Sequence, residues 1–301
     1  MASGSALDDD SFNGMTVSGL RRLQQKFDLH IEVRAGGFAF ADQAKQLQSL
    51  LDSNAHVIVI NSSKNIDEIL GFAGHHPEIR FIINDASVRG YDNVSSIAYG
   101  QGMGSCLVGA LCAWQTKTGK VGFIGGNENS VIQDFLSGFR AGVELSGKDV
   151  SVEVKFIRCG SAVEGFEDPQ QASLLARRMY ASGVDIIYAV AGLSGNGVIQ
   201  AARKTGNYVV GVDSNQDHMA KGTILTSMMK RLDVAVYNEV LSVLEGRFVP
   251  GPKNYDLSND GVCLTDMKYS RHLISKEVLH KLDGLKEKLV SGTVRLDFPV
   301  K

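Results

Sequence analysis

Short apolar runs rich in branched side chains alternate with amphipathic segments along this chain, and this alternation constrains its fold more than any other feature. The runs occupy residues 57–60, 81–83, 121–124, 152–157, 184–190 and 208–212. Runs of this kind are typical of parallel strands that are buried on both faces of a sheet. Between them, apolar residues recur at helical spacing, as Ile132, Phe135 and Phe139 do. The pattern occurs twice over 301 residues, so we predict two doubly wound α/β domains.

Composition and charge argue against several classes of protein. Hydrophobic residues make up 44% of the chain and the net charge is -2, which gives no electrostatic footprint for nucleic acid and no polybasic membrane patch. The four cysteines show neither metal-ligand spacing nor a C-x-x-C pair. No apolar run approaches the ~18 residues of a membrane-spanning helix. We therefore expect a globular protein that does not bind nucleic acid.

Polar or glycine-rich segments follow four of the predicted strands. They are Asn84-Asp85, Gly125-Gly126-Asn127, the glycine loop 192–197 and Asp213-Ser214-Asn215-Gln216. In open α/β sheets, ligands bind outside the carboxyl ends of the strands. Two such sheets facing each other form a cleft between domains, and we predict that this cleft is the ligand site.

The segment Asp8-Asp9-Asp10-Ser11-Phe12-Asn13 stands just before a helical pattern. It suits a small polar ligand with one flat face, because the ring can stack on that face and the polar groups can bond its edge. The alternative is that Asp and Ser cap the following helix. A strand should precede this loop, yet only residues 1–7 do, so we predict that the first strand is missing. We also expect the natural protein to carry that strand and an export signal upstream of Met1.

Four further positions each have two interpretations. Asp213 ends a predicted strand, where its carboxylate can accept from two vicinal sugar hydroxyls or cap a following helix. Asp85 has the same two interpretations. Lys230 is either a ligand contact or a solvated surface charge. The loop that begins at Gly192 contacts a neutral hydroxylated ligand or makes a plain turn, and its glycine spacing does not match a dinucleotide fingerprint.

The sequence offers little support for catalysis. His75 and His76 are adjacent and make a poor metal pair. The chain has no G-x-S-x-G turn, no H-E-x-x-H motif, and no serine or cysteine with a convincing base. We therefore predict a binding protein without turnover, cofactor or metal.

Six segments agree, in order, with one known family. They are residues 8–13, 117–126, 138–142, 195–198, 211–214 and 225–231. From Asp8 to Val294 the chain resembles the basic membrane protein (BMP) family, the purine-nucleoside receptor type of substrate-binding lipoproteins of ABC transporters. The resemblance implies a type I periplasmic-binding-protein fold, with two Rossmann-like domains joined by a three-crossover hinge. The expected lobes are residues 1–117 with 232–256, and residues 118–231 with 257–301.

The resemblance also implies which residues contact the base. Phe12 resembles the residue that stacks on the purine, and Asn13 and Asp10 flank it in the motif. Tyr188 falls where the family often has a second aromatic residue. Ser3 occupies the position at which the family commonly has an aspartate that contacts the base.

For the sugar, Asp213 and Lys230 resemble the ligands of the ribose hydroxyls, while Asp85 and the loop around Gly192 and Leu193 resemble further pocket positions. The resemblance implies a monomer that captures nucleosides, with a purine as the expected base, for the membrane permease of an ABC importer. It implies a periplasmic or extracytoplasmic, membrane-anchored location, with a cytoplasmic one as the alternative. Alternative functions are a pentose- or nucleobase-binding protein of the same fold, an intracellular nucleoside-sensing regulator, and a Rossmann-type enzyme.

Overall fold

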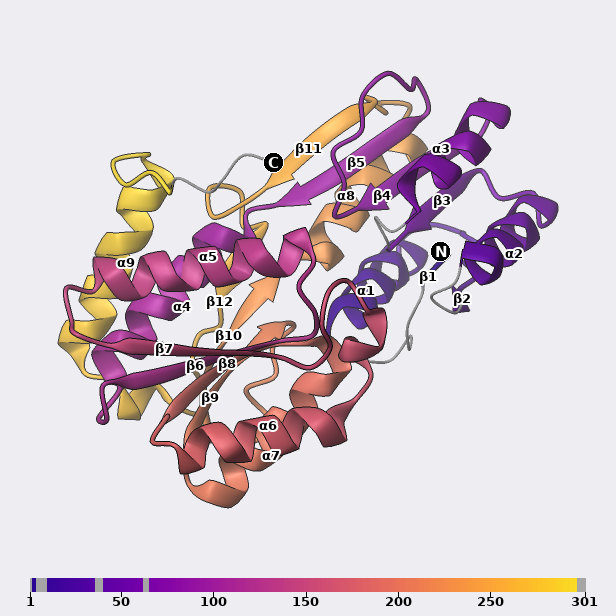
Figure 1. The fold of residues 1–301 in the computed structure, drawn as a ribbon. Coiled ribbons are helices and arrows are strands. Elements are labelled where there is room, and N and C mark those ends of the chain that lie inside the picture. Colours follow the sequence, from indigo (N-terminus) through magenta and orange to yellow (C-terminus); the bar gives the residue numbers. More distant parts are fainter. Residues whose placement is uncertain (1, 4–9, 36–39, 62–64, 297–301) are drawn as a thin grey trace. The chain divides into compact units, whose positions relative to one another are not determined.

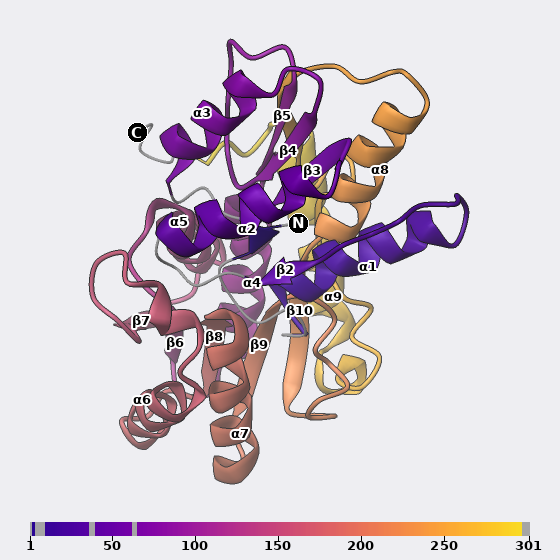
Figure 2. The same ribbon diagram turned by 90° about the vertical axis from the view of Figure 1, so that its right-hand side faces the viewer.

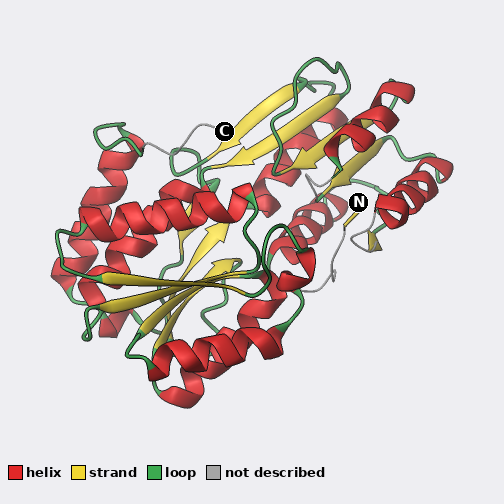
Figure 3. Cartoon of the chain, viewed as in Figure 1, coloured by secondary structure: helices red, strands yellow, loops and turns green. Residues whose placement is uncertain are grey.

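The structure, a computed structural model, describes residues 2–3, 10–35, 40–61 and 65–296. The chain divides into two compact units (Figure 1). The first unit contains Met1–Tyr99 and Arg231–Tyr255, and the second contains Gly100–Lys230 and Asp256–Lys301. Helices flank a sheet in each unit (Figure 3), which confirms the predicted α/β class.

The first unit is built on a sheet in the order β11-β5-β4-β3-β1-β2, in which the paired strands run parallel. Its strands are β1 (Ala2–Ser3), β2 (Arg34–Ala35), β3 (Val57–Ile60), β4 (Arg80–Asn84), β5 (Val94–Tyr99) and β11 (Gly251–Tyr255). Its helices are α1 (Phe12–Gln24), α2 (Phe40–Asp52), α3 (Ile66–His75) and α8 (Leu232–Leu244). Figure 2 shows α2 and α3 on one side of this sheet and α1 and α8 on the other. Buried side chains such as Phe81 and Ile83 fill the layer under α2 and α3, each stabilising the fold by about 1.5–3 kcal/mol.

A first strand is present among the described residues, which corrects the prediction that it is missing. Ala2 and Ser3 form the two-residue strand β1, which pairs with Arg34 and Ala35 of β2 and with Ile60 of β3. Two residues can fill this place in the sheet because their backbone groups offer partners to the strands on either side.

The second unit is built on a sheet in the order β12-β10-β9-β8-β6-β7, and of its described strands only β12 runs antiparallel to its neighbour. Its strands are β6 (Lys120–Gly125), β7 (Ser151–Phe156), β8 (Ile186–Val190), β9 (Tyr208–Asp213), β10 (Ile224–Lys230) and β12 (Val262–Leu264). Its helices are α4 (Gln101–Gln115), α5 (Ser130–Leu145), α6 (Pro169–Ala181), α7 (Gly195–Thr205) and α9 (Lys276–Val290), with 3-10 turns η1 (Val163–Phe166), η2 (Gly192–Ser194) and η3 (Arg271–Leu273). In Figure 1, α4 and α5 lie on one face of this sheet and α6 and α7 on the other.

The first passage between the units comes earlier than the sequence predicted. The expected boundary at residue 117 follows α4, whereas α4 belongs to the second unit because it packs along α5. The passages after Lys230 and Tyr255 lie within one residue of the predicted positions.

Three glycines let α4 and α5 pack with their backbones in contact. A Cβ atom built on Gly138 would lie 2.1 Å from a carbonyl oxygen of α4, and one on Gly142 would lie 1.9 Å from another. A Cβ atom on Gly109 would lie 2.0 Å from a carbonyl oxygen of α5. Any side chain at these positions would overlap the backbone of the neighbouring helix. We refer to Gly109, Gly138 and Gly142 together as the glycine contact.

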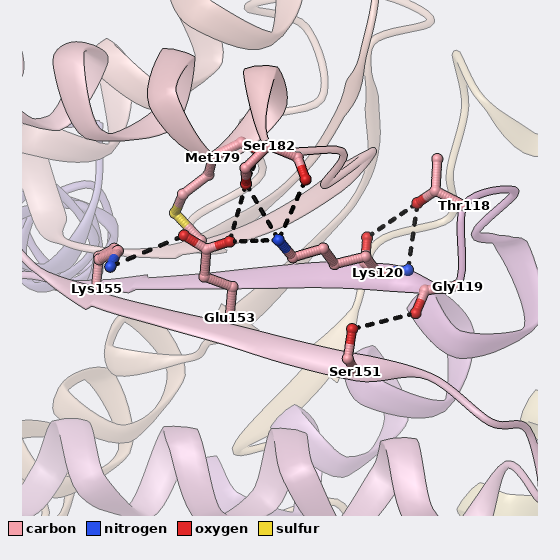
Figure 4. Close-up of polar contacts among 8 residues, drawn as sticks. All are labelled: Thr118, Gly119, Lys120, Ser151, Glu153, Lys155, Met179 and Ser182. Atoms are coloured by element: carbon pink, nitrogen blue, oxygen red, sulfur yellow. Dashed lines mark hydrogen bonds and ion pairs between the residues drawn. The ribbon is translucent and has the colours of Figure 1, made fainter.

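A polar cluster joins the start of β6 to the edge strand β7 (Figure 4). The Lys120 ammonium lies 2.9 Å from Oε2 of Glu153 and donates to two oxygens of Ser182, at 3.2 Å each. The Ser182 hydroxyl donates to the same Glu153 oxygen at 3.0 Å. Partial burial raises the pKa of Glu153, but the hydrogen bonds from Lys120 and Ser182 more than offset this, so the pKa lies below its ordinary value. Charged side chains on an edge strand also hinder pairing with another chain.

We expect Glu153→Gln to lower the free energy of unfolding by about 0.5–1 kcal/mol at pH 7. Since the folded state lowers the pKa of Glu153, the carboxylate stabilises the fold above its unfolded pKa, and this contribution is lost as pH falls through the folded value. The difference between variant and wild type in urea unfolding should therefore shrink as the pH falls through the folded pKa of Glu153. Lys155→Ala is the control, because its ammonium is 3.9 Å from Glu153 and half-exposed, and it should change little. A difference that persisted at low pH would assign the effect to packing.

Candidate functional site

The predicted site residues form one group in each unit. The first group lies at the N-terminus of α1 and the carboxyl end of β4, and the second lies at the carboxyl ends of β8, β9 and β10, apart from Tyr188, which lies inside β8. We refer to those of the first unit as the first half-site and to those of the second unit as the second half-site. The described part of the structure does not include Asp8 and Asp9 of the predicted loop, nor the side chain of Ser3.

The first half-site begins at the N-terminus of α1. Ser11 is the N-cap residue, yet among the described residues its side chain makes no capping hydrogen bond to this helix. The next residue, Phe12, is partly exposed, and Asp10 is exposed with a φ of +46°. The capping alternative is therefore not supported for Ser11.

Buried amides form a hydrogen-bonded chain behind Phe12. The Tyr99 hydroxyl donates to Oδ1 of Asn84 at 2.7 Å, and Nδ2 of Asn84 donates to Oδ1 of Asn61 at 2.7 Å. Nδ2 of Asn61 then donates to Oδ1 of Asn13 at 3.0 Å. The Thr16 hydroxyl also donates to Oδ1 of Asn61, at 3.0 Å. These five side chains, at most 7% exposed, are the amide chain of the first half-site.

Asp85 follows β4 directly and has a φ of +57°, and Asp213 ends β9 with a φ of +66°. Neither caps a helix: residues 86–93 and 214–223 are described in full and lead from each aspartate to the next strand without one. Non-glycine residues in this left-handed region carry backbone strain, which proteins concentrate at functional positions. The capping alternative is therefore wrong for both residues.

In the second half-site, Asp213 and Lys230 lie at the ends of neighbouring strands. Met229 stands opposite Asp213 in the ladder between β10 and β9, and Lys230 follows it. Asp213 is 7% exposed and Lys230 is 1% exposed, so the alternative of a solvated surface charge is wrong for Lys230. The Lys230 ammonium lies 5.6 Å from the centre of the Phe135 ring, a distance at which a cation and a ring attract.

A buried polar network supports the turn that follows Asp213. The side-chain oxygen Oε1 of Gln216 accepts from the backbone N–H of Val212 at 3.1 Å. The backbone N–H of Gln216 donates to the Ser227 hydroxyl at 3.1 Å. Asp217 accepts from the hydroxyls of Ser227 and Thr265 at 2.7 and 2.6 Å. Burial raises the pKa of Asp217, against the lowering effect of these two hydroxyls. The turn is thus held from inside the unit.

The glycine loop lies beside an aromatic ring that the sequence analysis missed. Gly192 has a φ of +53°, and Leu193 next to it is partly exposed. A Cβ atom on Gly192 would lie 3.6 Å from the Phe166 side chain, and one on Gly126 would lie 2.4 Å from its ring. Phe166, itself partly exposed, therefore spans the ends of β6 and β8. Its position two residues before the Asp168-Pro169 helix start was the only signal in the sequence.

Tyr188 has the contacts of a core side chain. It is fully buried, and its ring meets Phe123 edge-on at 5.8 Å and lies 5.6 Å from Phe139. Its hydroxyl is 3.2 Å from Oγ of Ser105 on α4. Because this ring faces the helices that cover the sheet, we leave Tyr188 out of the site.

Within the described residues, no group of three or more His, Cys, Asp or Glu side chains is placed to hold a metal ion. The same residues contain no helix that is both long and apolar enough to cross a membrane. One acceptor in the second half-site, Oδ1 of Asn196, is buried without a hydrogen-bond partner among the described residues.

Comparison with known sequences identifies the relatives of this chain. The family described as "ABC transporter substrate-binding protein PnrA-like" (Bmp) matches residues 1–297. The "CD4+ T-cell-stimulating antigen" of Listeria monocytogenes is 32% identical, over 96% of this chain and 85% of that protein. "Basic membrane protein A" of Borreliella burgdorferi is 28% identical, over 95% of this chain and 84% of that protein.

Solved structures share the fold. A solute-binding protein of an ABC transporter system from Aeropyrum pernix superposes with a TM-score of 0.89 at 24% identity, covering 100% of this chain and 93% of the other. A protein from Bacillus halodurans, described as a transcriptional activator of the comK gene, superposes with a TM-score of 0.80 at 19% identity, covering 99% of both chains. At these identities the likeness shows the fold alone, which is the type I periplasmic-binding fold.

Proposed function

Because the chain belongs to the Bmp family of PnrA-like ABC transporter substrate-binding proteins, we propose that it binds a purine nucleoside and delivers it to a membrane permease. The family consists of substrate-binding proteins rather than enzymes. The observation that carries the proposal is the burial of Asp213 and Lys230 at neighbouring strand ends.

The second half-site suits a ribose. A carboxylate accepts from two vicinal hydroxyls at once, and the Lys230 ammonium donates to hydroxyl oxygens. Both groups are almost fully buried, so a ligand that meets their hydrogen bonds gains more than it would in water. Asp85, Gly192 and Leu193 are proposed as further pocket positions.

The first half-site suits a base. Phe12, a partly exposed residue, is proposed to stack on the base, with Asn13 and Asp10 beside it in the sequence for the polar edge. Ser3 is proposed to contact the base where relatives commonly have an aspartate. A hydroxyl both donates and accepts, so we expect measurable binding of at least two purine nucleosides, with Ser3→Asp shifting the ratio between them.

A ligand panel read by thermal unfolding tests the proposal. A ligand at ~100 times its dissociation constant adds about 2.7 kcal/mol to the free energy of unfolding. We expect purine nucleosides to stabilise the protein, pyrimidine nucleosides to do so less, and free ribose or free bases to have little effect. Stabilisation by free pentoses alone would replace the proposal with sugar binding, and release of base and sugar on incubation would identify an enzyme.

The proposed location is extracytoplasmic, with the protein anchored at the membrane that holds the permease. The alternative is a cytoplasmic regulator that senses nucleosides, because this chain shares its fold with the Bacillus halodurans activator. Fractionation of cells of the source organism, with an antibody against this chain, distinguishes the two.

We expect Phe12→Ala to weaken the binding of all nucleosides by about 1–3 kcal/mol, because stacking on a ring tolerates any base. Phe12→Leu should recover part of the loss through apolar contact. Phe27→Ala is the matched control, because Phe27 is an exposed ring that follows the same helix and lies outside the half-site. Calorimetric titration with inosine, adenosine and uridine checks this. Equal affinities for Phe12→Ala and Phe27→Ala would remove Phe12 from the site.

A further inference from the structure

We propose that Asp217 is a positioning residue, which holds Asp213 in place for binding a ribose diol. The buried carboxylate of Asp217 ties the turn after β9 to β10 and to the residue that follows β12. The inference rests on the proposed function and adds to it a preference for ribonucleosides over 2′-deoxyribonucleosides. Asp217 acts on the ligand only through the residues that link it to Asp213.

Asp217 is hydrogen-bonded through both oxygens of its carboxylate. Its Oδ1 accepts from the Ser227 hydroxyl at 2.7 Å, and its Oδ2 accepts from the Thr265 hydroxyl at 2.6 Å. The backbone N–H of Thr265 also donates to the carbonyl of Ser227, at 3.1 Å. Asp217 is 1% exposed. Because hydrogen bonds to a charged acceptor are stronger than neutral ones, this carboxylate fixes both hydroxyls more firmly than an uncharged group would.

Ser227 passes this constraint on to the residue before Asp213. A hydroxyl has one proton and an ionised carboxylate only accepts, so the Ser227 proton is directed at Asp217. The Ser227 oxygen then accepts from the backbone N–H of Gln216, and Oε1 of Gln216 accepts from the backbone N–H of Val212. Val212 is joined directly to Asp213. A series of hydrogen bonds therefore leads from Asp217 to the peptide group next to Asp213.

The sequence leaves room for this series at Gly211, which stands opposite Ser227 in the ladder between β9 and β10. A Cβ atom on Gly211 would lie 2.6 Å from Oε1 of Gln216 and 2.8 Å from Oγ of Ser227. Any larger residue would displace both groups. Asp213 has a φ of +66°, and a strained backbone of this kind persists only where the surrounding structure holds it. The hydrogen-bonded turn provides that support.

The competing explanation is that Asp217 only satisfies two hydroxyls inside the unit. That explanation predicts a lower free energy of unfolding on substitution, but an unchanged ratio of affinities, because this ratio is independent of how much protein is folded. Positioning predicts a changed ratio. A carboxylate held against both hydroxyls of a diol rejects a sugar that lacks one of them, and a displaced carboxylate loses this advantage.

Four variants separate the two explanations. Asp217→Ala and Ser227→Ala each break the series of hydrogen bonds. Asp217→Asn keeps one acceptor oxygen, with which it can still accept from Ser227. Ser270→Ala is the matched control for Ser227→Ala, because the buried Ser270 hydroxyl donates to the carbonyl of Leu225, near the amino end of β10 and away from the half-site.

We expect the wild type to bind inosine and adenosine about tenfold or more tightly than their 2′-deoxy forms. Asp217→Ala and Ser227→Ala should lower this preference to about threefold or less. Asp217→Asn should keep more of it than Asp217→Ala does, and Ser270→Ala should keep all of it. Calorimetric titration gives the ratios, after circular dichroism has verified that each variant is folded. If Asp217→Ala fails to fold, Ser227→Ala, which removes one oxygen atom, provides the test.

Three results would overturn this inference alone. They are a wild type that binds ribo- and deoxyribonucleosides equally well, an unchanged ratio in the folded Asp217→Ala or Ser227→Ala variant, and an equal fall of the ratio in Ser270→Ala. A wild type that binds none of these nucleosides would overturn the proposed function and this inference with it.

Discussion

Gly142→Ala will lower the free energy of unfolding by about 3 kcal/mol, although alanine is by itself the better helix former by roughly 1 kcal/mol. The added Cβ atom would lie 1.9 Å from a carbonyl oxygen of α4, and a methyl group fixed to the backbone cannot rotate away. The two helices must therefore move apart, which opens gaps along the rest of their contact.

Gly284→Ala is the matched control for this variant. Gly284 lies within α9, and a Cβ atom there would have nothing within 4 Å. This change should leave the stability equal to that of the wild type or raise it by up to about 1 kcal/mol. Urea unfolding of the two variants checks the difference. Equal midpoints would mean that α4 and α5 do not pack through the glycine contact.

Asp213→Ala will weaken nucleoside binding by roughly 2–4 kcal/mol, which is about 30- to 1,000-fold. The reason is that two sugar hydroxyls would enter a buried place without their charged acceptor. Asp283→Ala is the control, since Asp283 is an exposed carboxylate on α9 of the same unit, and its removal should leave the affinity unchanged. Calorimetric titration gives both values. Wild-type affinity in Asp213→Ala would move the ribose site elsewhere.

Lys230→Met should weaken binding by a similar factor while sparing the fold. Methionine keeps a long apolar side chain next to Phe135, and it removes an ammonium that is only 1% exposed. Circular dichroism and urea unfolding of the ligand-free variant measure how far the fold is kept. A steep loss of stability would instead assign Lys230 to the scaffold.

The alternation of apolar runs and helices predicted most of the fold, because the six predicted runs became β3, β4, β6, β7, β8 and β9. The sequence analysis did not predict strands β5 and β10, because polar side chains interrupt their apolar runs. Ser95 in β5 donates to the buried Glu239, and Ser227 in β10 donates to the buried Asp217. Such hydrogen bonds satisfy a polar group inside the sheet, and their partners are distant in the sequence.

The sequence predicted the positions of candidate site residues that stand at the end of a strand. It did not predict which side chains of a strand are covered by helices. Asp85 and Asp213 follow from the rule that ligands bind at the carboxyl ends of parallel strands. Tyr188 does not, because a strand pattern gives the face of a side chain but not whether that face is covered by helices or open to a ligand. The sequence did not predict the amide chain, because Asn13, Asn61 and Asn84 come from separate βα units. Only the order of the strands in the sheet brings these residues together.

The glycine contact has a consequence for how the gene can change. Every single-nucleotide change that replaces a glycine by another amino acid adds at least a Cβ atom, and at these three positions that atom meets a backbone oxygen. No amino acid that a single-nucleotide change can place at Gly109, Gly138 or Gly142 is therefore expected to leave the stability unchanged. Exposed positions of α5 carry no such restriction, so we expect random mutagenesis under selection for folding to leave Gly138 and Gly142 invariant between variable positions on the exposed side of α5.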